Sequence, residues 1–177
     1  LSVTTGIITI SDFRQKHCAA GGEGAPLAVY GDYLIFSEKG KNRILLNMGG
    51  ISNFTFLSGS LDADKVFATD TGPGNTIMDA FMQMHYNKPF DKDGEISLNG
   101  QINKTLLSEL KKELFFEKPI PKTTGPEQFN LEFLHKAQKI TNTDNISRED
   151  VMATLSCFTA DTIVECIKKM PNSDMPD

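Results

Sequence analysis

The sequence predicts an α/β fold, in which a mixed β-sheet with a glycine hairpin is flanked by helices. Apolar residues of the first half form short, β-branched runs separated by glycines, which is typical of strands. After residue 75 the apolar residues recur at the 3.6-residue period of a helix. We therefore expect mainly strands and loops over residues 1–72 and mainly helices over residues 73–170, packed in layers.

The first expected strand is Gly6–Ser11, an apolar run that stops at Asp12. The stretch Ala19–Leu27 holds too many glycines for a regular element and predicts a loop. Three further strands are expected in succession, over Ile44–Met48, Ile51–Leu57 and Lys65–Thr69.

The second half predicts four helices from the spacing of its apolar residues. They are expected around Ile77–Met82, Leu98–Leu114, Phe129–Ile140 and Val151–Lys168. The last and longest follows Ser147-Arg-Glu-Asp150, a capping-box pattern that marks a helix start.

Composition excludes several classes of protein. A net charge of −5 with few arginines argues against a nucleic-acid partner. No apolar run has the length of a membrane span and no signal-like segment leads the chain, so we expect a cytoplasmic protein without a membrane partner. The three cysteines lack a CxxC pair and the histidines lack metal-ligand spacing, so the sequence indicates neither a disulfide framework nor a zinc site.

The pair Gly49-Gly50 has two interpretations. Spacing alone favours a two-residue hairpin turn, in which glycine supplies the positive φ that such turns need. A glycine turn also leaves its N–H groups open to an anion, so it can cradle a phosphate. The amide side chains of Asn47 and Asn53 flank the turn, which a plain hairpin does not require.

The stretch Asp70–Asn75, DTGPGN, raises the same question. It is either a strand-to-helix connection, with Pro73 as a turn former and Asn75 as N-cap, or a glycine-lined helix N-terminus that binds an anion. In the second interpretation Asp70 holds Mg²⁺ through water, because Mg²⁺ keeps several waters and takes few carboxylates.

Asp12 is the carboxylate best placed to act as a base, because it ends an apolar strand beside a flexible loop. Arg14 is close enough in sequence to keep it ionised. The commoner role of a single Asp at such a position is to cap a helix or turn, and an exposed ion pair with Arg14 would contribute little.

Six stretches together resemble the anhydro-N-acetylmuramic acid kinases, a family of the sugar kinase, Hsp70 and actin ATPase superfamily. In chain order they are SDFRQKHCAAGGEGAPL, LNMGGISNFTFL, ATDTGPGNTIMDAF, DKDGEIS, PKTTGPEQFN and REDVMATLSCFTADTI. The resemblance implies one incomplete lobe of an actin-like ATPase fold, a single partial domain over residues 1–177 from the interior of a longer two-lobed kinase. Elements of the family that would precede and follow this chain, such as a GTSMDG phosphate loop, do not occur in it.

The resemblance also implies an activity, in which MgATP and water convert 1,6-anhydro-N-acetylmuramic acid to N-acetylmuramic acid 6-phosphate. It makes Asp12 the general base and gives Arg14, Gly21 and Gly22 to the sugar, with Asp70 on Mg²⁺ through water. The residues it implies for the nucleotide phosphates are Gly49, Gly50, Asn53, Gly72 and Gly74. The fragment alone is expected to be inactive, and a homodimer of the longer protein is one expected assembly.

Two other functions stay open. The alternative is a superfamily member that binds a sugar or nucleotide without phosphoryl transfer, but the retention of Asp12 and of both glycine turns argues against it. An actin- or Hsp70-like ATPase is disfavoured because the DFR-to-GAPL element resembles the sugar kinases specifically. His17 stands where many members of the family carry an acidic residue.

Overall fold

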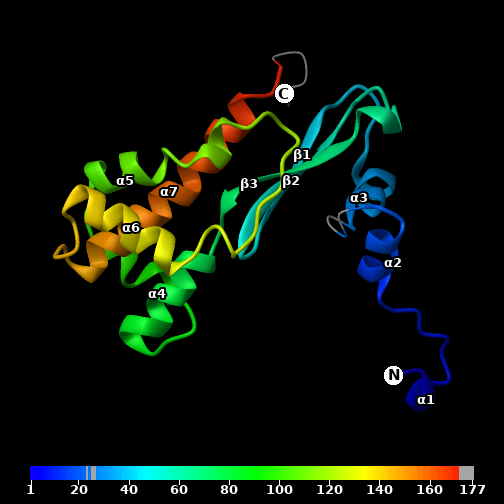
Figure 1. The fold of residues 1–177 in the computed structure, drawn as a ribbon. Helices are drawn as coiled ribbons and strands as arrows, with labels where there is room; N and C mark the ends of the chain where they lie inside the picture. The colour runs from blue at the N-terminus through cyan, green and yellow to red at the C-terminus, as the bar shows by residue number, and fades with distance from the viewer. Residues whose placement is uncertain (23, 25–26, 172–177) are drawn as a thin grey trace.

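A computed structural model describes residues 1–22, 24 and 27–171 of the chain. A three-stranded sheet lies between two groups of helices, with α4 to α7 on one side and α2 and α3 on the other (Figure 1). The helices are α1 (Ser2–Thr5), α2 (Phe13–Ala19), α3 (Val29–Phe36), α4 (Thr76–Tyr86), α5 (Lys104–Leu110), α6 (Leu131–Thr141) and α7 (Arg148–Lys168). None of the described helices is long and apolar enough to cross a membrane.

The sheet is antiparallel and follows the chain in the order β1 (Arg43–Met48), β2 (Ile51–Leu57), β3 (Phe67–Pro73). Side chains of β2 alternate between its two faces, as in any strand. Phe54 and Phe56 pack with Cys166 and Met170 of the α7 region, whereas Asn53 and Thr55 border a cavity on the α3 side. The sheet therefore has one apolar face and one polar face.

Helix α7 forms the spine of the helical side and begins as its sequence predicted. The Ser147 hydroxyl accepts a hydrogen bond from the Asp150 amide, which confirms the cap. The apolar α7 side chains of Met152, Leu155 and Phe158 are fully buried and pack against the buried faces of α4, α5 and α6. Lys111, at the end of α5, pairs with Asp161 and Glu165 of α7.

Most of the predicted elements are confirmed, with shifted ends. Strand β2 has the predicted bounds, and helices α4, α6 and α7 lie where the apolar periodicity placed them. The third strand begins two residues later than predicted, because Ala63–Lys65 form a 3-10 turn ahead of it. Pro73, expected in a turn, is the last residue of β3 and pairs with Ile51.

Two predicted elements are wrong. Gly6–Ser11 is an exposed segment without regular structure, because no described strand lies beside it to pair with. The helix predicted over Leu98–Leu114 is broken into a 3-10 turn, α5 and a second 3-10 turn, Leu114–Glu117. Gly100 causes the first break, since its Cα packs so tightly on the Glu149 carbonyl that a Cβ there would lie 1.9 Å from the oxygen.

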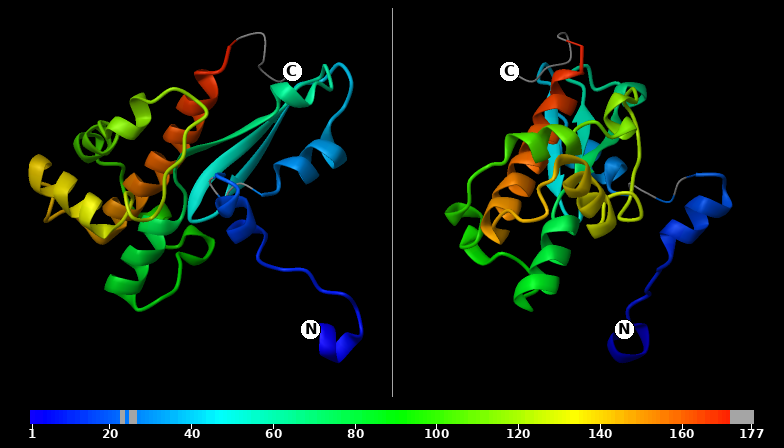
Figure 2. Two further views of the ribbon diagram at one scale, coloured as in Figure 1. Left: turned by 45° about the vertical axis from the view of Figure 1, so that its right-hand side comes forward. Right: turned by 60° about the vertical axis from the view of Figure 1, so that its left-hand side comes forward.

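The described residues of the N-terminal part of the chain form no hydrophobic core of their own. Helices α1, α2 and α3 contain no buried residue, and residues 1–11 extend away from the sheet in every view (Figures 1 and 2). Both hydrophobic clusters lie within residues 44–170. The sheet and helices α4 to α7 therefore form the stable body, and α3 lies against its polar face.

Candidate active site

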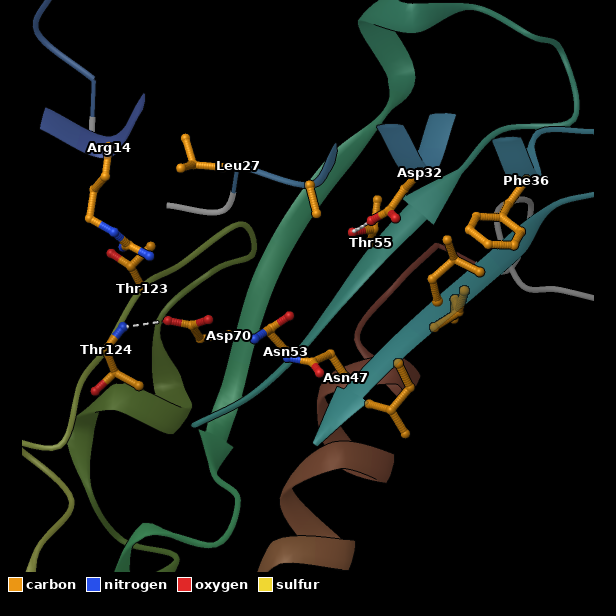
Figure 3. Close-up of a pocket in the computed structure, with 14 residues that line it drawn as sticks. Arg14, Leu27, Asp32, Phe36, Asn47, Asn53, Thr55, Asp70, Thr123 and Thr124 are labelled. Carbon is orange, nitrogen blue, oxygen red and sulfur yellow. Dashed lines mark hydrogen bonds between the residues drawn. The ribbon is translucent and has the colours of Figure 1, made fainter. Parts of the chain in front are cut away.

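A cavity of about 1090 Å³ lies between the polar face of the sheet and the N-terminal helices. One wall comes from all three strands together with the Thr123-Thr124 segment. The opposite wall comes from Arg14 of α2, the residues Leu27 and Ala28, and Asp32 and Phe36 of α3 (Figure 3). The sheet of the stable body thus supplies one side of the cavity, and the N-terminal segment that contains α2 and α3 supplies the other.

Three polar side chains form a row across the sheet wall. Asn47 of β1 pairs with Asn53 of β2, and Asn53 pairs with Asp70 of β3, so the three residues occupy matching positions on adjacent strands. All three line the cavity and lie in sequence across the strands in Figure 3. This polar row, Asn47–Asn53–Asp70, presents two amides and one carboxylate to a ligand.

Backbone groups hold Asp70 in place. Its Oδ2 accepts a hydrogen bond of 2.8 Å from the Thr124 amide, and its own amide donates to the Lys122 carbonyl at 2.9 Å. A carboxylate fixed by backbone donors keeps one orientation at little entropic cost. Asp70 therefore presents a preorganised acidic group to the cavity.

The helical wall carries charges of both signs. The Arg14 side chain reaches toward Thr123 in Figure 3, near the end of the polar row at Asp70. Asp32 accepts a hydrogen bond of 3.1 Å from the Thr55 hydroxyl, which ties α3 to β2. A ligand in the cavity would meet one cation and two carboxylates, a combination suited to a phosphorylated or polyhydroxylated molecule.

The two glycine turns predicted from sequence meet in space. The Gly49 carbonyl accepts a hydrogen bond from the Asn75 amide, and the Gly50 carbonyl accepts hydrogen bonds from the amides of Gly74 and Thr76. The hairpin thus satisfies the Thr76 amide, the first of α4, and the two amides that precede the helix. These three amides are therefore already hydrogen-bonded to the chain itself, and binding of an anion by the DTGPGN stretch stays a prediction.

The hairpin itself differs from the expected two-residue turn. Met48 pairs with Ser52, so three residues connect the ladder, and neither Gly49 nor Gly50 has a positive φ. Close approach explains Gly50 instead, since a Cβ there would lie 2.8 Å from Thr76 Oγ1. A Cβ at Gly49 would meet nothing closer than 3.8 Å, so a small side chain would fit there.

Gly72 and Gly74 are buried beneath the hairpin. Gly72 adopts a φ of +143° against the Phe116 ring, and a Cβ on Gly74 would lie 2.2 Å from the Gly49 carbonyl oxygen. Both residues let the end of β3 pack closely on its neighbours. Their contact with nucleotide phosphates stays a prediction.

The remaining predicted residues lie on or after α2. Asp12 is the exposed N-cap of α2 with a φ of +63°, its side chain makes no capping bond, and its Oδ2 accepts a hydrogen bond from the Ser11 hydroxyl. No ion pair joins it to Arg14 within the described part of the chain. Of the two, only Arg14 lines the cavity.

The glycine loop is organised by His17. Its Nδ1 accepts a hydrogen bond of 3.0 Å from the Gly24 amide, and its ring lies against Gly22, where a Cβ would come within 2.2 Å of Nε2. Neither Gly21 nor Gly22 lines the cavity. Residues 23, 25 and 26 of the predicted loop lie outside the described residues.

The polar row fits a hard divalent cation better than a transition metal. Asp70 and the two asparagines offer oxygen ligands, which Mg²⁺ prefers. No group of three His, Cys, Asp or Glu side chains with metal-binding geometry occurs among the residues that the structure describes. One carboxylate with water and phosphate oxygens is a typical Mg²⁺ environment in phosphoryl-transfer sites.

Sequence reasoning missed four of the polar residues in the cavity: Asp32, Thr55, Thr123 and Thr124. Asp32 lies in α3, whose other residues are mostly apolar on every side of the helix, so no periodicity indicates which side faces the cavity. Thr123 and Thr124 lie in a connection broken by Pro and Gly, which only pairing with β3 brings to the site.

Comparison with known proteins identifies the family of the chain. The chain matches the family model for anhydro-N-acetylmuramic acid kinase over residues 1–175. Proteins of that name from Pseudoalteromonas atlantica and Pseudoalteromonas translucida are 58% and 56% identical over 94% and 98% of this chain, which covers 42% and 44% of their lengths. One from Shewanella baltica is 41% identical over 97% of the chain, with 46% of its length covered.

The chain spans less than half of the length of these relatives, and the match extends over nearly all of its own residues. Its sheet and flanking helices form an incomplete lobe of the actin-like ATPase superfamily to which the family belongs. The chain is a member of the anhydro-N-acetylmuramic acid kinase family.

Proposed function

We propose that this chain is part of an ATP-dependent kinase that hydrolyses the anhydro ring of 1,6-anhydro-N-acetylmuramic acid and phosphorylates its O6. The observation that carries the proposal is the polar row Asn47–Asn53–Asp70, which faces Arg14 across one cavity in a chain of this family. The product would be N-acetylmuramic acid 6-phosphate, an intermediate of peptidoglycan recycling.

In this proposal Asp12 accepts a proton from the water that attacks C1. The anhydro bridge opens, and the freed O6 attacks the γ-phosphate while ADP leaves. Asp12 directly precedes α2, and Arg14 of that helix reaches the cavity. The base would therefore lie beside the helical wall, which is proposed to bind the sugar. Its exposure leaves room for both a water molecule and a sugar.

The sheet wall would receive the nucleotide. Asn53 and the open turn at Gly49 and Gly50 are proposed to bind the phosphates, and Asp70 is proposed to hold Mg²⁺ through water. Bound Mg²⁺ would neutralise charge on the phosphates, which together with positioning is most of the catalysis in phosphoryl transfer. The backbone bond from Thr124 keeps Asp70 oriented for that purpose.

Because the reaction consumes ATP, we place it in the cytoplasm. A homodimer of the longer protein, and inactivity of residues 1–177 alone, are further predictions. Binding of a sugar or nucleotide without transfer remains the second candidate, since the cavity by itself would serve either purpose.

The test is an assay of the full-length protein with MgATP and 1,6-anhydro-N-acetylmuramic acid, with the products read by mass spectrometry. We expect Asp12→Asn to reduce turnover by about a hundredfold or more, as for loss of a general base. Asp64→Asn, an exposed aspartate beyond the cavity, is the matched control and should keep full turnover.

Equal turnover in Asp12→Asn and the unaltered protein would remove Asp12 from its role while the kinase stands. Absence of phosphorylated sugar from the unaltered protein, with ATP still bound, would favour the binding protein instead.

A further inference from the structure

Lys122 is buried without an acidic partner. Only 7% of its surface is exposed, and no carboxylate among the described residues lies within ion-pairing distance of its ammonium group. Its Nζ donates to the Phe115 carbonyl at 2.9 Å and more weakly to the Phe116 carbonyl at 3.5 Å. The same atom lies 4.3 Å from the centre of the Phe115 ring.

Burying an ammonium group in such surroundings is costly, and here it lowers the pKa of Lys122 through desolvation. Two carbonyls and an aromatic face offset part of that cost. A methionine or leucine would fill the same space more cheaply. The free-energy cost of burying the ammonium group indicates that Lys122 has a role besides packing.

The main chain of Lys122 binds β3 at Asp70, a member of the polar row, and at the preceding residue, Thr69. Its amide donates to Thr69 Oγ1 at 3.0 Å, and its carbonyl accepts hydrogen bonds from the Asp70 amide at 2.9 Å and from the Thr69 hydroxyl at 3.3 Å. Two residues later the Thr124 amide binds the Asp70 carboxylate. The segment 122–124 therefore binds both the backbone and the side chain of Asp70.

The side chain of Lys122 fixes that segment to the body. It reaches from the sheet edge to the aromatic cluster of Phe115, Phe116 and Phe129, in which neighbouring rings lie 5.4 to 5.6 Å apart. The cluster also packs on α7 through Phe158. Movement of the ammonium group would therefore be transmitted to Thr124 and from there to the carboxylate of Asp70.

We propose that Lys122 is a positioning residue, whose buried ammonium group holds the segment 122–124 on β3 so that the Thr124 amide aims the Asp70 carboxylate into the cavity. The proposal rests on the proposed function in that Asp70 is taken to face Mg²⁺ and nucleotide. Lys122 touches neither ligand, because it does not line the cavity.

The experiment uses the full-length protein and two readouts that do not depend on turnover. The first is hydrogen–deuterium exchange of peptides covering residues 119–128 without ligand, and the second is Mg²⁺-dependent ADP binding by calorimetry. Lys122→Met is compared with Lys118→Met, an exposed lysine 6.0 Å from the same Phe115 ring. Asp70→Asn and the Lys122→Met, Asp70→Asn double variant complete the cycle.

We expect Lys122→Met to speed exchange over residues 119–128 but not within α7, and to weaken Mg²⁺-dependent ADP binding by about tenfold, as for residues that orient a metal ligand. Lys118→Met should change neither readout. In the Asp70→Asn background Lys122→Met should add almost nothing, because both changes act through one carboxylate.

Unchanged exchange over residues 119–128 in Lys122→Met, or effects of the two variants that simply add, would overturn the positioning role. If Asp70→Asn does not alter Mg²⁺-dependent binding, the proposed metal role of Asp70 fails, while exchange still tests the hold of Lys122 on its segment. Should Lys122→Met not fold, Thr69→Val removes the other anchor of the segment and is judged by the same two readouts.

Discussion

At the scale of single residues, Gly74 and Gly49 are neighbours that differ in whether a side chain could replace their hydrogen. A Cβ on Gly74 would lie 2.2 Å from the Gly49 carbonyl oxygen and 2.8 Å from Ser52 Oγ, both held by the sheet. A Cβ on Gly49 would meet only ordinary contacts, the nearest at 3.8 Å. The junction of hairpin and helix therefore requires glycine on one side only.

We expect Gly74→Ala to lower the free energy of unfolding of the full-length protein by about 2 kcal/mol, because the overpacked backbone must shift. Gly49→Ala should lie within about 0.5 kcal/mol of the unaltered protein, even if nucleotide binding changes. Urea denaturation of both variants measures the difference. Equal stability of the two would contradict the crowding described at Gly74.

At the scale of elements, Asp91 ties together the turns that follow α4. Partial burial opposes ionisation of Asp91, but the amides of Ile96 and Ser97 donate to its two oxygens and outweigh that effect, so its pKa is lowered. The unfolded chain then binds more protons than the folded one. This contribution to stability is present at neutral pH and is lost as pH falls through the lowered pKa.

We expect Asp91→Asn to cost about 1–2 kcal/mol of stability at pH 7, as for hydrogen bonds to a charged group. The difference from the unaltered protein should shrink as the solution is acidified below the ordinary range of aspartate. Asp93→Asn, at an exposed neighbouring position, is the control. Thermal unfolding across a pH series tests this, and a difference that grows toward acid would refute the assignment.

At the scale of the whole molecule, α3 is the anomaly. Apart from Asp32 it carries apolar and aromatic residues around its circumference, yet Tyr30 is 73% exposed, Leu34 63% and Ile35 72%. Helices of this kind are normally buried. Its polar links to the body include three hydrogen bonds, from Thr55 to Asp32, from Arg43 to the Phe36 carbonyl and from the Tyr33 hydroxyl to the Leu61 carbonyl.

Residues 1–177 prepared alone should therefore bind a hydrophobic dye strongly. Replacing Leu34 and Ile35 together by glutamate should reduce dye fluorescence, because it removes two members of a contiguous patch. The paired control, Leu98→Glu with Leu114→Glu, alters residues of similar exposure outside that patch and should leave most of the signal. Equal loss in both would mean that the patch on α3 is not the source.

The sequence predicted the parts of the fold that local pattern determines. Strand β2 is a short run that starts directly after the glycine pair and α7 carries its own cap, so both were placed correctly. Leu98–Leu114 has a helical period, but contact of Gly100 with the backbone of α7 breaks it. Asn53 and Asp70 were selected from sequence, whereas Thr124 joins the site through a bond to a residue 54 positions earlier, which no local pattern contains.

The polar row also has a consequence for folding. Because Asn47, Asn53 and Asp70 occupy matched positions on three strands, a slip of one residue between strands would turn an amide or the carboxylate toward the aromatic layer under α7. Such a misaligned sheet would bury unsatisfied polar groups and would be strongly disfavoured. The residues that we assign to the ligand thus also fix the register of the strands. Replacing them with apolar residues would remove this penalty and would allow the sheet more than one register.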